Sequence, residues 1–151
     1  INKDMATTVT ATTLTSTITE SISLNGNTYG NTISHSVATV GECLSSTMSV
    51  ALTEVTVLTL GTVDAGGTVV GDNVKYMRFT NLDDTNFITL SFKASGEHFS
   101  VKLNAGESYV CMNNQMNAEA DAGIGTLQDF TSVTAKADTV ICDMEYIVVS
   151  S

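Results

Sequence analysis

Threonine dominates this chain: it supplies 24 of the 151 residues, and eight of these lie between residues 7 and 19. Because threonine is β-branched, rotation about χ1 is restricted and the side chain fits a pleated sheet better than a helix. The sequence contains no proline and no tryptophan. These features predict β-strands along the whole chain.

The N-terminal part of this pattern alternates in polarity with a period of two. Leu14 and Ile18 share one parity, whereas Thr15 and Thr17 take the other. This period predicts a strand with one buried face. An Asn-Gly pair at 25–26 supplies the positive φ angles of a tight turn, and even spacing resumes after it. Residues 14–37 are therefore predicted to form a long hairpin.

The middle of the chain predicts a meander of short strands. Alternating stretches between residues 74 and 112 are separated by polar turns at 81–86, 95–97 and 104–107. The residues predicted to point inward are Ile88, Leu90, Phe92, Phe99, Val101 and Leu103. Earlier, within 43–60, the phase of the alternation changes at 53–54, which predicts a bulge or a bend between two sheets.

The last strand, predicted at 141–149, is apolar at most positions of both faces, so we expect it to be central or covered by a partner subunit. Residues 127–130 are compatible with one helical turn. The fold class predicted from these patterns is all-β: an antiparallel β-sandwich, jelly-roll-like, of about eight strands. Residues 1–13 are predicted to form a Thr-rich arm, and residues 14–151 a single domain.

The charge balance restricts the class of partner. Six basic and 16 acidic residues give a net charge of −10. A nucleic-acid-binding protein needs a basic stripe, and an anionic membrane attracts basic segments, so neither partner is expected. No apolar run reaches the length of a transmembrane helix.

The candidate reactive residues form no recognisable motif. Cys43, Cys111 and Cys142 are widely spaced, and we interpret them as buried thiols, with one disulfide and a spare thiol as the alternative. His35 and His98 lie in strand-like segments without metal-ligand spacing, and we interpret them as partly exposed strand residues.

The acidic and glycine-rich segments are interpreted as turns. The pair at 83–84 is typical of a turn in which aspartate caps its own backbone, with calcium binding or acid–base chemistry as the alternative. Asp64 and Asp72 lack the ligand spacing of a calcium loop. No catalytic triad signature or phosphate loop is present. We therefore expect no enzymatic activity, no cofactor and no metal.

The remaining candidates are partner contacts. Lys75, Arg78, Lys93 and Lys102 are four of the six basic residues. They are interpreted as members of cross-strand pairs with acidic neighbours, or alternatively as a positive facet that meets an acidic partner. The Thr-rich arm is either a flexible tail or a strand added to a neighbouring subunit. The residues predicted to contact a partner are Thr7, Thr8, Thr10, Thr12, Thr13, Lys75 and Arg78.

Several of these segments resemble a known class of protein. The strand-and-turn texture of residues 74–83, 87–90, 103–109 and 144–149, and of the start running into 22–26, is similar to that of small all-β virion proteins of tailed bacteriophages. The resemblance covers roughly residues 14–112 and 140–149 and carries no functional residues with it.

The resemblance implies a structural role in a phage particle. The expected protein is a capsid decoration or cement protein on the outer capsid surface, with the major capsid protein as partner and a homo-oligomer, most often a trimer, as its state. A phage tail or fibre component that binds a receptor is the alternative. A carbohydrate-binding β-sandwich is a further alternative, although the sequence lacks the tryptophans that usually stack on sugars.

Overall fold

The structure is a computed structural model that describes residues 9–63, 68–117 and 124–151. Within these residues it contains strands and one 3-10 turn, Gly71–Asn73, but no α-helix, which confirms the all-β prediction. The strands are β1 (Thr12–Thr19), β2 (Ile22–Leu24), β3 (Asn27–Tyr29), β4 (Thr32–Val40), β5 (Glu42–Val50), β6 (Val55–Gly61), β7 (Thr68–Val70), β8 (Val74–Asn81), β9 (Ile88–Ala94), β10 (Glu97–Leu103), β11 (Ser108–Cys111), β12 (Gln115–Met116), β13 (Gln128–Asp129), β14 (Ser132–Ala137) and β15 (Cys142–Ser150).

Contacts along the chain divide it into two compact units, residues 1–42 and residues 43–150. The sequence had predicted a boundary between residues 13 and 14 instead. The difference arises because β1 already includes Thr12 and Thr13, and because β1 pairs with β4 rather than with a strand of the second unit. The first unit is a hairpin, and the second is a sandwich.

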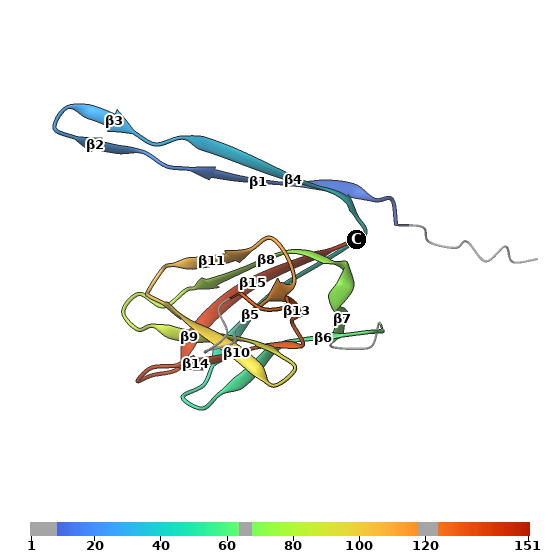
Figure 1. Cartoon of the computed structure of the whole chain (residues 1–151). Helices are drawn as coiled ribbons and strands as arrows, with labels where there is room; N and C mark the ends of the chain where they lie inside the picture. Colours follow the sequence, from blue (N-terminus) through green and yellow to red (C-terminus); the bar gives the residue numbers. More distant parts are fainter. Residues whose placement is uncertain (1–8, 64–67, 118–123) are drawn as a thin grey trace, which may run out of the picture. The chain divides into compact units, whose positions relative to one another are not determined.

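The hairpin is a long two-stranded ribbon, drawn in blue in Figure 1. Paired positions keep one register from Leu14 opposite Val37, in β1 and β4, to Leu24 opposite Asn27, in β2 and β3. The connection is the pair at 25–26, whose φ angles of 51° and 80° are those of the tight turn that an Asn-Gly sequence favours. The predicted hairpin at 14–37 is confirmed. We call it the ribbon.

The second unit contains two antiparallel sheets that pack as a sandwich (Figure 1). One sheet has the order β11-β8-β15-β5, and the other has the order β10-β9-β14-β6-β7, in which only β6 and β7 run parallel. The chain crosses between the sheets after β5, β7, β8, β10 and β14, and it also crosses between β11 and β14 by way of β12 and β13. The first of these crossings contains the predicted change of phase at 53–54, so the predicted bend between sheets is confirmed.

Aromatic side chains fill the core between the two sheets. Phe79 of β8 meets Phe92 of β9 edge-on, with their ring centroids 5.7 Å apart. Phe92 also packs against Phe99, Tyr109 and Phe130 at 5.0–5.4 Å. Because these aromatic pairs add to the apolar burial, they fix how the two sheets face each other. Of the residues predicted to point inward from β9 and β10, Ile88, Leu90, Phe92 and Leu103 belong to this core, and Phe99 and Val101 are partly buried against it.

The last strand, β15, lies between β8 and β5, which confirms its predicted central position. The sequence also suggested that one face of this strand is covered by a second chain, but the apolar residues of that face within the strand are already at least half-buried by this chain itself. Val149 is only 2% exposed and Ile147 is half-buried within this chain, whereas Ile141, which precedes the strand, is 63% exposed. The predicted helical turn at 127–130 is wrong, because Gln128–Asp129 forms β13 and pairs with β12.

The turn at 81–86 has the predicted form. One carboxylate oxygen of Asp83 accepts hydrogen bonds from the backbone N–H groups of Thr85 and Asn86, at 2.8 and 2.5 Å. These bonds lower the pKa of Asp83, the N–H of Asn86 having the larger effect. The side chain therefore caps its own turn.

Candidate functional site

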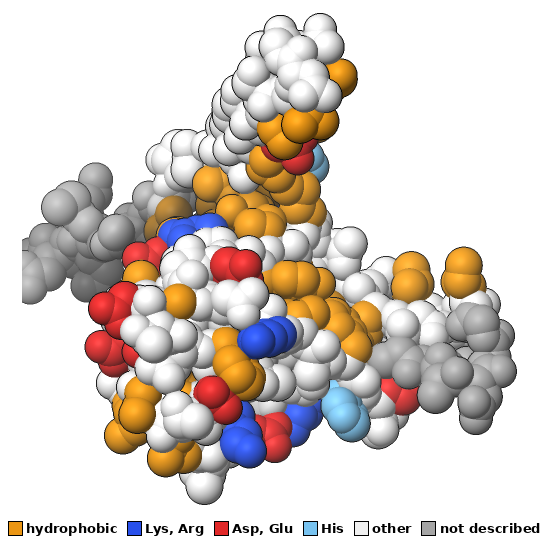
Figure 2. Space-filling model, turned by 90° about the vertical axis from the view of Figure 1, so that its left-hand side faces the viewer, with side chains coloured by type: hydrophobic (Ala, Val, Ile, Leu, Met, Phe, Trp, Pro, Cys, Tyr) orange, Lys and Arg blue, Asp and Glu red, His pale blue; other side chains and the backbone are white. Residues whose placement is uncertain are grey.

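The two faces of the ribbon differ completely in chemistry. One face carries the apolar residues of both strands because Ile18 pairs with Ile33 and Ile22 pairs with Tyr29. We call it the apolar face; its residues are Leu14, Ile18, Ile22, Leu24, Tyr29, Ile33 and Val37, with Ser16, Glu20, Asn27 and His35 among them. In Figure 2 the apolar side chains of the ribbon gather along one side of it.

The apolar face is exposed, which corrects the predicted buried face. Ile18 is 45% exposed, and Ile22, Leu24 and Ile33 are each 58% exposed. The period-two pattern identified the residues that share the face but gave no information on what covers them. An exposed apolar surface of several contiguous residues marks an interaction site in a soluble protein.

The opposite face of the ribbon carries hydroxyl groups. Thr17 and Ser34 are cross-strand neighbours whose hydroxyl oxygens lie 3.1 Å apart, and those of Thr19 and Thr32 lie 3.3 Å apart. Such cross-strand hydroxyl pairs stabilise a two-stranded ribbon modestly. They also account for the threonine bias of this part of the sequence.

The Thr-rich residues predicted as partner contacts lie in different settings. Thr7 and Thr8 lie outside the described residues. Thr10 is exposed and precedes β1, whereas Thr12 and Thr13 are exposed residues of β1. Thr12 pairs with Val40 of β4, so this end of the predicted arm belongs to the ribbon.

The two basic residues predicted as partner contacts lie on β8. Arg78 forms an ion pair with Glu145 of β15 and donates a hydrogen bond to Thr80. This confirms the interpretation of Arg78 as a member of a cross-strand pair. Lys75 is exposed and donates to the backbone oxygen of Asp72 at 3.2 Å.

The other two predicted basic residues lie in the second sheet, so the four do not form one facet. Lys93 pairs with His98, and Lys102 pairs with Thr89. Thr89 is also the neighbour of Lys136, which brings a third lysine to the same outer surface. The sequence analysis missed Lys136 because only the long-range register between β9 and β14 places it there.

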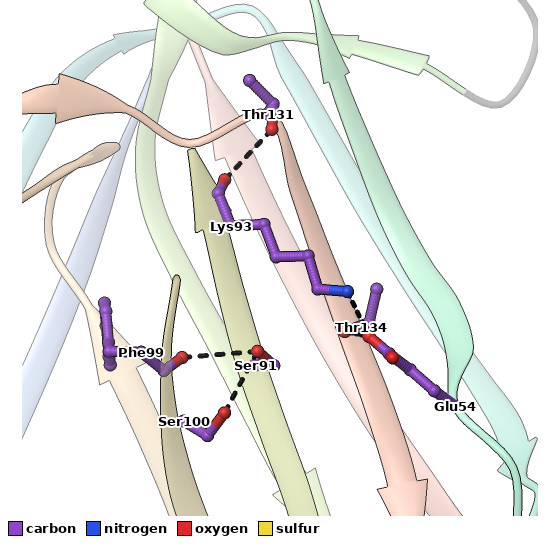
Figure 3. A network of polar contacts seen from close by, with 7 residues as sticks. All are labelled: Glu54, Ser91, Lys93, Phe99, Ser100, Thr131 and Thr134. Carbon is purple, nitrogen blue, oxygen red and sulfur yellow. Dashed lines mark hydrogen bonds and ion pairs between the residues drawn. The ribbon is translucent and has the colours of Figure 1, made fainter. Parts of the chain in front are cut away.

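This surface is a polar depression on the five-stranded sheet, with a volume of about 290 Å³. We call it the polar face; it is lined by Glu54, Thr89, Ser91, Lys93, His98, Ser100, Thr134, Ala135 and Lys136. Figure 3 shows Lys93 and Thr134 both reaching one carboxylate, that of Glu54. Thr134 donates to it at 2.6 Å, and Ser100 donates to Ser91 at 3.1 Å.

The carboxylate of the polar face is held by hydrogen bonds and charge and is not activated as a general acid. The contact with Lys93, followed by that with Thr134, lowers the pKa of Glu54, so this carboxylate stays ionised and paired. A general acid at neutral pH needs the opposite shift. The other two described carboxyl groups with a resolved shift, Asp83 and Glu107, also have lowered pKa values.

Neither a metal-binding cluster nor a membrane-spanning helix is found among the described residues. No group of three or more His, Cys, Asp or Glu side chains among them is arranged to hold a metal ion. No described helix is long and apolar enough to cross a membrane. The two histidines are both exposed strand residues, as predicted, His35 in β4 and His98 in β10.

The three cysteines are free thiols. Cys142 is buried and Cys111 is half-buried, but Cys43 is exposed, so the prediction of three buried thiols is wrong for Cys43. Cys43 lies in β5, an edge strand of its sheet, which accounts for its exposure. Burial raises the pKa of Cys111 to about 12.

Comparisons with known proteins identify no family for this chain. No family model and no curated protein matches the chain. Among solved structures, a subunit described under Bacillus endospore appendages, a family of disulfide-linked pili, is similar over 100% of this chain and 98% of its own. The identity is 10% and the TM-score is 0.41. At this level of similarity, nothing is transferred from that protein to this chain.

Proposed function

We propose that this protein is a non-enzymatic structural subunit that works as part of a larger assembly. The observation that carries the proposal is the exposed apolar face of the ribbon. An isolated two-stranded ribbon is at best marginally stable in water, and packing against further structure is what stabilises it. A chain that keeps such a face, with Ile22 and Ile33 more than half exposed, is built to be covered by another molecule.

The chemistry of the described residues supports a role without catalysis. The most developed polar cluster, around Glu54, is satisfied by internal contacts with Lys93 and Thr134. The thiol of Cys111 has a raised pKa, which is the opposite of what a nucleophilic cysteine needs.

The finer form of the proposal is a decoration or cement protein on the outer capsid surface of a tailed bacteriophage, bound to the major capsid protein and present as a homo-oligomer, with a trimer as the specific expectation. The resemblance of the strand-and-turn segments supports it. The net charge of −10 supports an outer position, because packaged DNA would repel an acidic subunit. Binding at many equivalent capsid sites turns modest contacts into a large total stabilisation.

The polar face offers a complementary contact for such a shell. Lys93, Lys102 and Lys136 bring half of the chain's six basic residues to one sheet surface. Because Lys93 is paired with Glu54 within the chain, Lys102 and Lys136 are the cations of this surface that favour an acidic partner and orient its docking. In this proposal the polar face sets the orientation in which the subunit docks on the shell.

A tail or fibre component is the second candidate, and Tyr29 favours it. This tyrosine lies three residues after the turn glycine, Gly26, and is 54% exposed. Exposed tyrosines on a hairpin tip are well suited to contact a receptor because they combine apolar area with a hydroxyl group.

The experiment locates the protein on purified phage particles by immunogold labelling. Labelling of the capsid surface is expected, whereas labelling confined to the tail replaces the capsid proposal with the tail proposal. Absence from purified particles contradicts the virion role altogether. Full-length protein is then added to bare capsids beside a variant that lacks residues 1–13. Full occupancy and heat resistance with the shortened variant would contradict a role for the Thr-rich arm.

A further inference from the structure

The apolar face of the ribbon has a layered pattern along its length. Each layer within the strands is a cross-strand pair, and between β1–β4 and β2–β3 a backbone hydrogen bond from Glu20 to Asn31 continues the same register. The layers from base to tip are Leu14 with Val37, Ser16 with His35, Ile18 with Ile33, Glu20 beside Asn31, Ile22 with Tyr29, and Leu24 with Asn27. Apolar and polar layers thus alternate. On either side of the Ile18–Ile33 layer there is first a polar layer and then an apolar layer, Leu14–Val37 toward the base and Ile22–Tyr29 toward the tip.

This symmetry has a physical consequence. A contact between two identical surfaces about a two-fold axis requires the surface to be complementary to itself. If the axis passes through the Ile18–Ile33 layer and turns one ribbon end for end, apolar layers face apolar layers and polar layers face polar layers. Shifting the axis to the neighbouring layer would set Glu20 against its own copy, which is unfavourable.

We propose that the apolar face of the ribbon is covered by the apolar face of the ribbon of a second copy of this chain, antiparallel to it and centred on Ile18 and Ile33. This inference rests on the proposed structural role and names the partner of its principal surface. Among the described residues, no third strand pairs with either edge of the ribbon, so within that part of the chain its sheets stay two-stranded.

The antiparallel arrangement also matches the polar layers. The two-fold axis brings Glu20 of one copy to the layer of Ser16 and His35 in the other. An imidazole carries at least one N–H donor in any protonation state, and a carboxylate is an acceptor. Each of the two symmetry-related contacts therefore has a donor on one ribbon and an acceptor on the other.

Charge also favours contact through the ribbon. Between residues 9 and 42 the acidic side chains are Glu20 and Glu42 only, and no lysine or arginine is present, although the whole chain has a net charge of −10. Two copies that approach through this segment avoid most of their mutual repulsion. In the antiparallel orientation, the two chains also leave the paired ribbons at opposite ends, and each continues from there into its own acidic second unit.

The size of the contact predicts its strength. From Leu14 to Leu24 a strand rises about 3.4 Å per residue, so the face is roughly 35 Å long and 10 Å wide, or about 350 Å². That is below the roughly 800 Å² per partner of a standard stable interface, so the pair should be modest in affinity and useful mainly when repeated. At the base, Val37 is buried and Leu14 half-buried, so Leu14 supplies the contact in that layer.

Charge substitution at the centre tests the proposal. The variants Ile33→Glu and Ile33→Lys each place a charge in the apolar layer at the axis, and each is expected to weaken self-association about tenfold or more in sedimentation equilibrium of the full chain. An equimolar mixture of the two variants is expected to recover association, because opposite charges then meet across the contact. Ser36→Glu, on the hydroxyl face of the same strand, is the matched control and should associate like the wild type.

The orientation has its own test. Glu20→Lys and His35→Glu are expected to weaken association singly, and the double variant is expected to restore it. Unchanged association in Ile33→Glu, failure of the mixture to recover, or a wild type that stays monomeric up to sub-millimolar concentration overturns the pairing of ribbons. None of these results moves the protein off purified particles, so the proposed function is judged separately by its location there.

Discussion

Gly30 lies directly against the backbone of Glu20: a Cβ atom at position 30 would stand 2.0 Å from the Glu20 carbonyl oxygen and 2.5 Å from its carbonyl carbon. Gly30 also has a φ of +125°, a conformation that side chains disfavour. The adjacent hydrogen bond, from the N–H of Glu20 to the carbonyl oxygen of Asn31 at 2.9 Å, continues the ribbon between β1–β4 and β2–β3.

Substitution of Gly30 by alanine should therefore open the outer half of the ribbon. We expect a local loss of about 1–3 kcal/mol from strain and the broken hydrogen bond. Hydrogen exchange followed by mass spectrometry should show faster exchange in peptides that cover residues 20–31. Gly41→Ala is the control, because nothing lies within 4 Å of the added Cβ. Equal exchange in the two variants would contradict the close approach.

Thr39 should be a site of stored strain. It has a φ of +58°, which is unusual for a β-branched residue, and it lies where the register between β1 and β4 shifts between Thr12 and Leu14. Thr39→Gly is expected to stabilise the base of the ribbon by about 0.5–1 kcal/mol, the relief of strain exceeding the entropy lost by glycine. The readout is slower hydrogen exchange near residues 12 and 40.

A regular strand position supplies the comparison. Thr32→Gly, in β4 opposite Thr19, removes a cross-strand hydroxyl contact and should destabilise the ribbon. If Thr39→Gly is as destabilising as Thr32→Gly, the positive φ of Thr39 carries no strain.

The cap made by Asp83 should be visible in the pH dependence of unfolding. Its pKa is lowered in the folded state, chiefly by the N–H groups of Asn86 and Thr85, so its contribution is present above the unfolded pKa and is lost as the pH falls through the folded pKa. Asp83→Ala should lower the Tm at neutral pH, and its difference from the wild type should shrink as the pH falls below about 4.

Thermal melts from neutral to acidic pH check this expectation. Asp84→Ala is the neighbouring control, because Asp84 accepts a bond from the hydroxyl group of Thr85 and caps no backbone N–H group among the described residues. A difference between Asp83→Ala and the wild type that stays constant across this range would show that the ionised carboxylate is not what matters.

Local patterns in the sequence were sufficient for most of the fold. Period-two alternation identified which residues share a face, and the Asn-Gly pair at 25–26 fixed the register of the ribbon because a two-residue turn leaves only one pairing. The inward set of β9 and β10 follows from the same rule. The bend at 53–54 was found because a change of phase cannot occur within one regular strand.

What the sequence did not predict depends on long-range placement. Alternation identifies which residues share a face, but it does not show whether another part of the protein packs against that face. The apolar face was therefore expected to be buried, whereas Ile33 is 58% exposed. Lys136 joins Lys93 and Lys102 only through the pairing of β14 with β9. Arg78 and Lys93 were grouped by closeness in sequence, although β8 and β9 belong to different sheets.

The three thiols should differ sharply in reactivity. Cys43 is exposed, whereas burial raises the pKa of Cys142 and raises that of Cys111 to about 12. Because the thiolate is the reactive form, a disulfide reagent at about pH 8 should modify one thiol per folded chain quickly. All three thiols should react in denaturant, since none is in a disulfide.

The Cys43→Ser variant should abolish the fast reaction, and Cys111→Ser should leave it unchanged. The slow reaction of Cys111 should accelerate only as the pH approaches its raised pKa, or when the sandwich unfolds and exposes the sulfur. Two fast thiols in the wild type, or a fast thiol that persists in Cys43→Ser, would contradict the burial of Cys111 and Cys142 between the sheets. Fewer than three thiols in denaturant would show that a disulfide forms in solution.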